Sequence, residues 1–355
     1  MWIENKIYFE DLKSIIDDKN IDWKLLSNKN IYITGATGLI GRNLVNAILY
    51  ANMNLGINCT IYAHVRNIEK ARMLFESQAS DKLKFIVGDI QDEINCDEKI
   101  DYIIHAASQT ASKKFIEDPV STIDIAINGT RNVLNLAKKN NVDSFVYLST
   151  MEVYGRPQTD EKIDEKHSTD LNTMDVRNCY PISKRMCENL CACYNVNSKV
   201  IRLTQTFGPG VEYNDGRVFA EFARCAIENR DIVLHTTGET KRSYLYTADA
   251  IRAIFTILLK GKNNEIYNVA NEETYCSILE MANLVKDKCT DGKINVNIEI
   301  EDINKFGYIP KLCMNLDTTK IQELGWKPKV NLENIYKKLI SSLRRSEKWT
   351  KFLKK

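Results

Sequence analysis

A glycine-rich turn near the N-terminus limits the folds open to this chain more than any other feature. It reads TGATGLIG and places Gly35, Gly38 and Gly41 between a β-rich run, Ile31–Ile33, and a segment with helical periodicity. Glycine is needed where the backbone turns with positive φ or approaches a ligand closely, and the following helix offers free N–H groups to an anion. We therefore predict a strand–turn–helix unit that binds the pyrophosphate of a dinucleotide. The expected contacts are Gly35, Thr37, Gly38, Leu39, Ile40 and Gly41.

The segments that follow alternate between short apolar runs and stretches of helical length. The apolar runs, which we interpret as strands, are Cys59–Val65, Lys84–Val87, Tyr102–His105, Phe145–Leu148 and Lys199–Leu203. The helical stretches are Asn67–Gln78, Val120–Asn140 and Pro181–Tyr194. This alternation is typical of a parallel sheet covered by helices on both faces. The predicted fold class is α/β: a Rossmann-type, doubly wound parallel sheet with a smaller mixed α/β substrate-binding lobe at the C-terminus.

The alternation breaks after about residue 205, where the pieces become shorter. They include a helix at Val218–Glu228, a strand at Ile232–His235 and a last helix around Leu332–Arg344. We predict three parts: an N-terminal helical extension over residues 1–28, a dinucleotide-binding domain over 29–205, and a substrate lobe over 206–355 that interleaves with it. The apolar spacing in the extension favours packing against its own domain over docking on a partner.

Composition and charge exclude several classes of protein. The formal net charge of +2 gives no global field that would draw the chain to nucleic acid or to an anionic membrane. No apolar run approaches the roughly 20 residues that span a bilayer, and the N-terminal stretch is too acidic for a signal peptide. The ten cysteines form no CxxC pair and the four histidines are scattered, which argues for buried, reduced thiols and against a metal site. We expect a cytoplasmic protein without nucleic-acid or membrane partners.

The end of the second strand bears on the choice of dinucleotide. An acidic residue there holds the ribose of NAD, whereas an arginine suits the extra phosphate of NADP. The chain reads IYAHVRNIEK, with Arg66 and no acid at this point. We expect NAD as the cofactor, with NADP admitted by Arg66. Asp89 and Ile90, after the third strand, are the expected neighbours of the adenine.

A tyrosine and a lysine mark the second candidate site. Tyr180 and Lys184 are four residues apart and share one face of a helix. A free tyrosine, with a pKa of about 10, is a poor base at neutral pH; we expect the Lys184 ammonium and the positive nicotinamide of an oxidised cofactor to favour its phenolate. Such a tyrosine can take a proton from a sugar or alcohol hydroxyl while hydride leaves for nicotinamide. Ser149 and Thr150 end a strand of the same sheet, where a hydroxyl can bond the reacting oxygen.

These stretches resemble the extended short-chain dehydrogenases that act on nucleotide sugars, the NAD-dependent epimerase/dehydratase family. The matching motifs are TGATGLIG, HAAS (105–108), NGTRNVL (128–134), STMEVYG (149–155), CYPISK (179–184), RLTQTFGPG (202–210), RSYLYTADA (242–250), EIYNVAN (265–271) and LGWKP (324–328). They follow in order over nearly the whole chain from about residue 29. The resemblance implies a nucleotide-diphosphate sugar as substrate and an enzyme that oxidises the C4 position of the sugar and works through a 4-keto intermediate.

The resemblance also implies roles for individual residues. Thr150, Tyr180 and Lys184 would be the catalytic trio, with Glu152 available as a base near C5. The cofactor would be held by Ala106, Ala107, Ser108, Asn128, Tyr180 and Lys184 in addition to the turn. Arg217 and Arg242 would face the nucleotide diphosphate, since a guanidinium grips phosphate oxygens bidentately. The remaining substrate contacts would be Ser149, Met151, Gln205 and Val218.

Departures from the family's motifs bear on the middle step of the reaction. Dehydratases of the family carry an Asp-Glu pair where this chain has Met151-Glu152, and a thioether cannot donate a proton to a departing hydroxyl. The motifs are most similar to those of UDP-glucuronate decarboxylases, yet Cys313 and Met314 stand where those enzymes have arginines, and Gln205 replaces a common asparagine. We expect an NDP-sugar epimerase. The alternatives are decarboxylation, 4,6-dehydration, reduction of a keto-sugar, and a cofactor sensor without chemistry.

The resemblance further implies a homodimer that pairs through the helix of Tyr180 and the long helix before it. Cys187, Cys191 and Ala192 form a small, sulfur-rich stripe on the first of these helices. The stripe fits either a dimer seam or an internal core.

Overall fold

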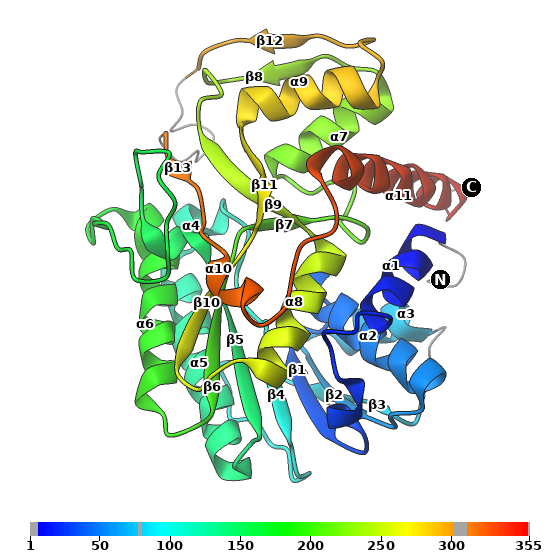
Figure 1. The fold of residues 1–355 in the computed structure, drawn as a ribbon, viewed down its shortest axis with the longest axis vertical. Coiled ribbons are helices and arrows are strands. Elements are labelled where there is room, and N and C mark those ends of the chain that lie inside the picture. The colour runs from blue at the N-terminus through cyan, green and yellow to red at the C-terminus, as the bar shows by residue number, and fades with distance from the viewer. Residues whose placement is uncertain (1–5, 77–79, 302–310, 354–355) are drawn as a thin grey trace.

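A seven-stranded sheet lies at the centre of the computed structural model, which describes residues 6–76, 80–301 and 311–353 (Figure 1). Its strands are β1 (Asn30–Thr34), β2 (Thr60–Val65), β3 (Leu83–Val87), β4 (Tyr102–His105), β5 (Ser144–Thr150), β6 (Ser198–Leu203) and β10 (Glu265–Val269). All pairings are parallel, and the order is β10-β6-β5-β4-β1-β2-β3. The strand order reverses between β1 and β4, and ligands of such sheets bind beyond the carboxyl ends at that point.

Helices cover both faces of the sheet, as the alternating pattern predicted. One face carries α2 (Leu39–Leu55), α3 (Ile68–Phe75) and α8 (Thr247–Lys260); the other carries α5 (Pro119–Asn140) and α6 (Cys179–Cys193) (Figure 1). Two buried apolar clusters correspond to these two faces. The predicted α/β fold class and its doubly wound parallel sheet are confirmed.

The chain beyond residue 205 builds a second region above the sheet (Figure 1). Four strands, β7 (Gln205–Phe207), β9 (Lys241–Tyr246), β11 (Asn271–Ser277) and β13 (Cys313–Met314), form one mixed sheet, and β8 (Ile232–Leu234) pairs with β12 (Val296–Ile298). The helices of this region are α7 (Val218–Glu228), α9 (Ile278–Cys289) and α11 (Leu332–Leu353), whereas α10 (Thr319–Gln322) lies against β10 of the main sheet. Between them, α8 and β10 return to the main sheet. Residues past the predicted boundary at 205 therefore contribute to both regions.

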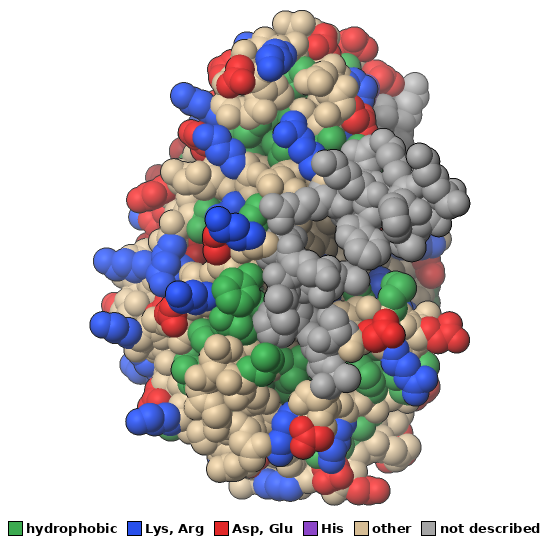
Figure 2. Space-filling model, turned by 90° about the vertical axis from the view of Figure 1, so that its right-hand side faces the viewer, with side chains coloured by type: hydrophobic (Ala, Val, Ile, Leu, Met, Phe, Trp, Pro, Cys, Tyr) green, Lys and Arg blue, Asp and Glu red, His purple; other side chains and the backbone are tan. Residues whose placement is uncertain are grey.

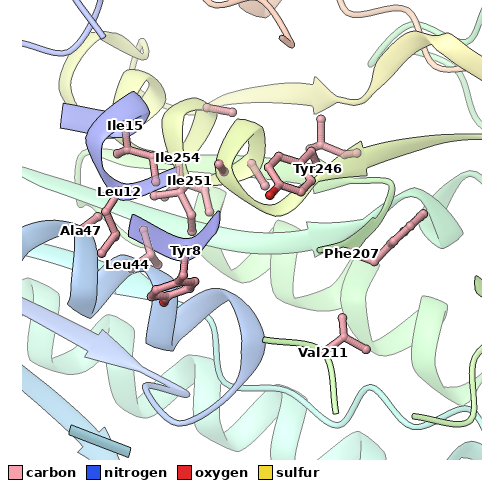
Figure 3. Packing of buried hydrophobic residues seen from close by; sticks show 14 of the residues in the cluster. Tyr8, Leu12, Ile15, Leu44, Ala47, Phe207, Val211, Tyr246, Ile251 and Ile254 are labelled. Atoms are coloured by element: carbon pink, nitrogen blue, oxygen red, sulfur yellow. The ribbon is translucent and has the colours of Figure 1, made fainter. Parts of the chain in front are cut away.

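The N-terminal segment is built into the core. Its helix α1 (Lys6–Ile16) and the 3-10 turn η1 (Trp23–Leu26) precede β1. Tyr8, Leu12 and Ile15 point from α1 towards side chains of α2 and α8, including Leu44 and Ile251 (Figure 3). The segment thus packs against its own chain, which is the arrangement that its apolar spacing favoured.

The surface shows no concentration of one charge on the face drawn in Figure 2, where basic and acidic side chains are interspersed with apolar ones. In the part of the chain that the structure describes, no helix is both long and apolar enough to cross a bilayer.

A buried ion cluster joins α8 to the N-terminal and C-terminal segments. Arg252 is 1% exposed and pairs with Asp249 and, at 3.0 Å, with Asp18. The Asp249 carboxylate also accepts the backbone N–H groups of Lys329 and Val330 at 3.0 and 3.1 Å. Burial raises the pKa of Asp249, and Arg252 opposes this effect. The cluster therefore depends on the guanidinium to keep a buried carboxylate charged.

Replacing Arg252 tests this dependence. Arg252→Met leaves Asp249 buried without its counter-ion, so we expect the free energy of unfolding to fall by about 3–5 kcal/mol. The control is Arg230→Met, which removes a half-exposed guanidinium from pairs with Glu221 and Glu228 and should cost about 1 kcal/mol or less. Urea denaturation followed by circular dichroism gives both values, and equal losses in the two variants would contradict the account.

Candidate active site

The backbones of the β1 and β4 ends come together at the reversal of the strand order. Gly35 has φ +65°, and a Cβ built on it would lie 2.9 Å from the Ala106 carbonyl carbon and from the Ala107 Cα. A Cβ on Gly41 would lie 2.2 Å from the Gly35 oxygen, so the first turn of α2 also excludes a side chain. Only glycine fits at these two positions, as the turn motif indicated.

The turn leaves the N-terminus of α2 open to a ligand. Gly38 caps the helix with extended backbone and offers no side-chain hydrogen bond to its first N–H groups. Gly38 is exposed, and Thr37, Leu39 and Ile40 are half-buried around it. An uncapped helix end next to a cradle that a Cβ would fill matches a pyrophosphate in shape and charge.

A chain of buried hydrogen bonds supports the HAAS loop beneath the turn. The Thr34 hydroxyl accepts the N–H groups of Ala106 and Ala107, both at 3.0 Å, and lies 2.7 Å from the Nδ1 atom of His105. The Nε2 atom of His105 lies 3.2 Å from the Thr130 hydroxyl. Burial lowers the pKa of His105 to about 3, so the ring is neutral at physiological pH. The loop that ends in Ser108 is therefore tied to β1 by neutral groups.

The predicted adenine end lies along the ends of β2 and β3. Arg66 is exposed just after β2, and Asp89 accepts the Gln91 N–H at 3.0 Å. Ile90 is buried against Gly129 of α5, where a Cβ would lie 2.9 Å from it. Sequence reasoning missed Asn132, whose amide donates to the carbonyls of residues 90, 91 and 92 at 2.8–3.1 Å. The roles of Arg66, Asp89 and Ile90 towards a cofactor stay predictions.

Helix α6 presents Tyr180 and Lys184 on one buried face, as their spacing predicted. The Lys184 ammonium donates to the Leu148 carbonyl of β5 at 2.8 Å. It lies 4.7 Å from the ring centroid of Tyr147 and 5.9 Å from that of Tyr180. Burial lowers the pKa of Lys184 to about 8. The carbonyl at the end of β5 thus fixes the lysine behind the tyrosine.

The environment of the Tyr180 hydroxyl differs from the one expected from sequence. Burial is the largest effect and raises its pKa, and the nearby Glu152 carboxylate raises it further. A hydrogen bond with Thr150, and the charges of Arg177 and Arg217, lower it. In the structure the Lys184 ammonium donates to the Leu148 carbonyl, and its expected effect on the phenolate, together with that of the cofactor, stays a prediction. A positive ring beside the phenol would favour the phenolate.

Glu152 is held in an ion pair that the sequence did not reveal. It lies in the 3-10 turn η3 (Met151–Tyr154), and its carboxylate accepts from Arg177 of η4 (Val176–Asn178) at 3.0 Å. The Arg177 guanidinium also lies over the ring of Phe115, 4.9 Å from its centroid. Phe115 in turn stacks on Tyr180, with ring centroids 4.3 Å apart and planes 7° from parallel. Phe115 comes from α4 (Lys114–Glu117), and no motif in the chain singled it out.

Two of the positions that depart from family motifs, Met151 and Met314, meet in one apolar cluster. Met151 is buried together with Leu312, Met314 and Leu316, and its sulfur accepts from the Thr204 hydroxyl at 3.3 Å. Cys313 is buried on β13 beside Lys241 of β9. Met151 and Met314 therefore make the surroundings of η3 apolar. These are the positions where the dehydratases of the family have an acid and the decarboxylases have an arginine.

Ser149 is turned away from the predicted substrate contact. Its hydroxyl donates to Glu188 of α6 at 2.5 Å, and Glu188 pairs with Arg202 at 2.7 Å. The hydroxyl is thus committed to a buried ionic group within the domain. Asn128 lies half-buried on α5.

The remaining predicted substrate residues lie along the second region. Gln205 begins β7, half-buried, and Val218 begins α7 behind Arg217. Arg217 pairs with Asp215 within 2.5 Å and stays partly exposed, while its charge reaches Tyr180. Arg242 on β9 has a buried Nε atom without a hydrogen-bond partner among the described residues. The guanidinium groups of Arg217 and Arg242 therefore both belong to the second region.

The sulfur-rich stripe on α6 belongs to the core of the domain. Cys187 and Cys191 are buried, and the Cys187 thiol lies 3.2 Å from the Ala126 carbonyl of α5. Ala192 and Cys193 are exposed on the same helix. All ten cysteines are unpaired, and the described residues contain no group of three potential metal ligands.

Comparisons with known proteins agree with this geometry. UDP-glucuronic acid decarboxylase 5 of Arabidopsis thaliana is 29% identical over 312 residues, which cover 86% of each chain. dTDP-D-glucose 4,6-dehydratase of Mus musculus is 28% identical over 343 residues, 90% of this chain and 89% of that one. A structure of UDP-glucuronic acid 4-epimerase from Bacillus cereus, in complex with UDP-glucuronic acid and NAD, superposes with a TM-score of 0.74 at 20% identity, covering 89% of this chain and 99% of that one. This last likeness confirms the fold.

The family resemblance predicted from the motifs is confirmed by a match that runs from β1 to the end of β10. Residues 31–270 match the NAD dependent epimerase/dehydratase family, a span that includes the glycine turn and the helix of Tyr180. The chain belongs to this family of enzymes, and its cofactor is NAD.

Proposed function

We propose that this enzyme converts a nucleotide-diphosphate sugar by oxidation at C4, through a 4-keto-sugar intermediate, and that the net reaction is a 4-epimerisation. The observation that carries the proposal is the grouping of Thr150, Tyr180 and Lys184 at the carboxyl end of β5, in the same parallel sheet as the glycine turn after β1. The known proteins that it matches act on UDP- and dTDP-sugars by their names, which supports this class of substrate.

The three residues would divide the work at C4. The Tyr180 oxygen takes the proton of the C4 hydroxyl, and Thr150, already close enough to bond Tyr180, holds the reacting oxygen in place. Lys184 supplies a fixed positive charge on the same helix face, held by the Leu148 carbonyl. Bound NAD supplies the acceptor for the hydride from C4. Inversion would require the keto group to be reduced on its opposite face, and Tyr180 would then return the proton to the C4 oxygen.

The surroundings of the trio favour this reaction over dehydration. A dehydratase needs an acid for the departing C6 hydroxyl, and this position is Met151, buried among Leu312, Met314 and Leu316. Glu152 is the other candidate acid or base, and its carboxylate is engaged by Arg177. Inversion at C4 needs no proton-transfer group beyond Tyr180, so it is the simplest reaction that this site can carry out.

Decarboxylation of a UDP-glucuronate-like sugar is the second candidate. The likeness to the Arabidopsis thaliana decarboxylase over most of both chains supports it. Once C4 is a ketone, a C6 carboxylate can leave as carbon dioxide without an acid at Met151. Arg177 also offers a cation near the trio that the sequence did not suggest.

A panel of substrates separates these reactions. The purified protein with NAD would be incubated with UDP-glucose, UDP-glucuronate, UDP-N-acetylglucosamine and dTDP-glucose, and the products followed by NMR. Epimerisation gives a sugar of unchanged mass with inverted C4, decarboxylation gives a pentose and carbon dioxide, and dehydration gives a 4-keto-6-deoxy sugar. Failure to turn over any of the four, with NAD bound, would count against the proposed function and for a cofactor sensor.

We also propose a cytoplasmic homodimer. Its ten unpaired cysteines suit a reducing compartment. Val120 at the start of α5 and Met186 on α6 are 66% and 49% exposed, and we infer that these two apolar side chains contact a second copy. A Met186→Glu variant should sediment as a monomer while the wild type sediments as a dimer; equal sedimentation of the two would reject this seam.

Removing the Tyr180 hydroxyl should abolish proton transfer while leaving the fold intact. We expect Tyr180→Phe to lower kcat by about 10²–10⁴-fold, with NAD binding changed little. Tyr194→Phe is the matched control, since that hydroxyl is exposed just after the end of the same helix, where it donates to Asn135 at 2.9 Å. Steady-state kinetics measure both variants, and a Tyr180→Phe enzyme within a factor of three of the wild type would disprove the assigned role.

Adding a methyl group inside the glycine cradle should weaken cofactor binding. Gly41→Ala would place a Cβ 2.2 Å from the Gly35 oxygen, so the turn must shift and NAD affinity should fall about 10–100-fold. Gly216→Ala is the control, because a Cβ there meets no atom within 4 Å. Titration calorimetry with NAD reports both affinities, and an unchanged affinity for Gly41→Ala would show that the cofactor does not use this turn.

A further inference from the structure

The inference below rests on the proposed function and concerns a residue that the family motifs left without a role. We infer that Arg177 is a positioning residue: it neutralises the Glu152 carboxylate and braces Phe115 against Tyr180, so that the Tyr180 hydroxyl can give up its proton beside a carboxylate.

Three elements bring their side chains to this point. Arg177 comes from η4, Glu152 from η3 and Phe115 from α4, and each packs at the start of α6 near Tyr180. The Arg177 Nη2 atom lies 3.0 Å from the Glu152 Oε2 atom, with the two side chains 11% and 22% exposed. The rest of the guanidinium faces the Phe115 ring, and its Nε atom is buried without a hydrogen-bond partner among the described residues.

The Phe115 ring contacts both a cation and a phenol. The Arg177 Cζ atom lies 4.9 Å from the ring centroid, and Tyr180 stacks on Phe115 with centroids 4.3 Å apart and planes 7° from parallel. A cation over a ring attracts the ring face electrostatically, and stacked aromatic rings restrict each other's orientation. Arg177 therefore restrains the orientation of the Tyr180 ring through Phe115, although it does not bond the hydroxyl.

The Glu152 carboxylate disfavours ionisation of Tyr180 unless a positive charge lies beside it. A carboxylate beside a phenol disfavours the phenolate, because two like charges would then share a site of low dielectric. Glu152 raises the pKa of Tyr180, whereas Arg177 lowers it. With Arg177 in place its charge opposes part of the Glu152 effect on Tyr180; without it, an unpaired carboxylate would face the hydroxyl that must ionise.

Other titratable and charged groups also face Tyr180, and an Arg177 variant leaves their chemical identity unchanged. They are Lys184 and Cys179 on α6, Tyr147 on β5, Glu152 on η3, and Arg217 before α7. Because only the guanidinium is removed in an Arg177 variant, a change in the ionisation of Tyr180 reports the Arg177–Glu152 balance.

The ionisation of Tyr180 can be measured without turnover. The protein would be labelled with tyrosine that carries ¹³C at Cζ, saturated with NAD, and titrated by NMR, with the Tyr180 signal assigned from its absence in Tyr180→Phe. We expect Arg177→Met to raise the titration midpoint of Tyr180 by about one pH unit or more. Arg177→Met/Glu152→Gln should return the midpoint to near the wild-type value, since the unpaired carboxylate is gone. Glu152→Gln alone should lower the midpoint, and this conservative change keeps the test open if Arg177→Met does not fold.

The matched control is Arg156→Met. Arg156 pairs at 3.2 Å with Asp175, the residue that caps η4, so its loss disturbs the same turn without touching Glu152 or Phe115. Its midpoint should equal that of the wild type. An unchanged midpoint in Arg177→Met, or a double variant as high as Arg177→Met, would overturn the inference.

Kinetics then separate this inference from the proposed function. With a substrate that is turned over, the rising, acid-side limb of the pH–kcat profile, which reports the ionisation of Tyr180, should move to higher pH in Arg177→Met and back in the double variant. If no substrate is found, the proposed function fails, whereas the NMR titration still decides whether Arg177 and Glu152 control Tyr180.

Discussion

The contact between the backbones of Gly35 and Ala106 is the constraint on which the rest of the structure depends. It brings the carboxyl ends of β1 and β4 together at the reversal of the strand order, where no side chain fits between them. The same contact brings the uncapped start of α2 next to the HAAS loop, and the Thr34–His105–Thr130 hydrogen bonds hold that loop with uncharged groups. Ligands of such sheets bind at this reversal of the strand order.

The second constraint is the attachment of α6 to β5. The Lys184 ammonium is bound to the Leu148 carbonyl, which places Tyr180 one turn earlier, beside Thr150. Burial there makes the phenol a weaker acid than free tyrosine, so the site must supply positive charge before the tyrosine can act as a base. Arg177, Arg217 and the cofactor can supply it, while Glu152 opposes it. The proposed chemistry at C4 would therefore depend on a balance of charges around one buried hydroxyl.

Local patterns in the sequence predicted most of the strands and helices of the main sheet. The strands and helices up to β6 follow from apolar runs and glycine punctuation, and the steric need for Gly35 and Gly41 could be stated from the turn motif alone. The spacing of Tyr180 and Lys184 correctly indicated a shared helix face. The return of β10 to the edge of the main sheet depends on pairing with β6, which no local pattern encodes.

The parts of the site that sequence reasoning missed are contacts between distant segments. Arg177 stands three residues before Tyr180, yet its importance comes from Glu152 and Phe115, which reach it from other turns of the chain. Ser149 ends a strand next to Thr150, but its hydroxyl is taken by Glu188, a bond that could not be foreseen without the packing of α6. We expected Lys184 to act on Tyr180 because residues four apart share one face of a helix. In the structure the Lys184 ammonium is bound to the Leu148 carbonyl.

The central claim is that hydride leaves C4 of a nucleotide sugar for the bound cofactor. The most direct measurement is mass spectrometry of the enzyme-bound cofactor after mixing with a nucleotide sugar that carries deuterium at C4. The account predicts that deuterium appears on the bound cofactor during turnover and returns to C4 of the product. Product formation with a cofactor that never acquires deuterium would contradict it.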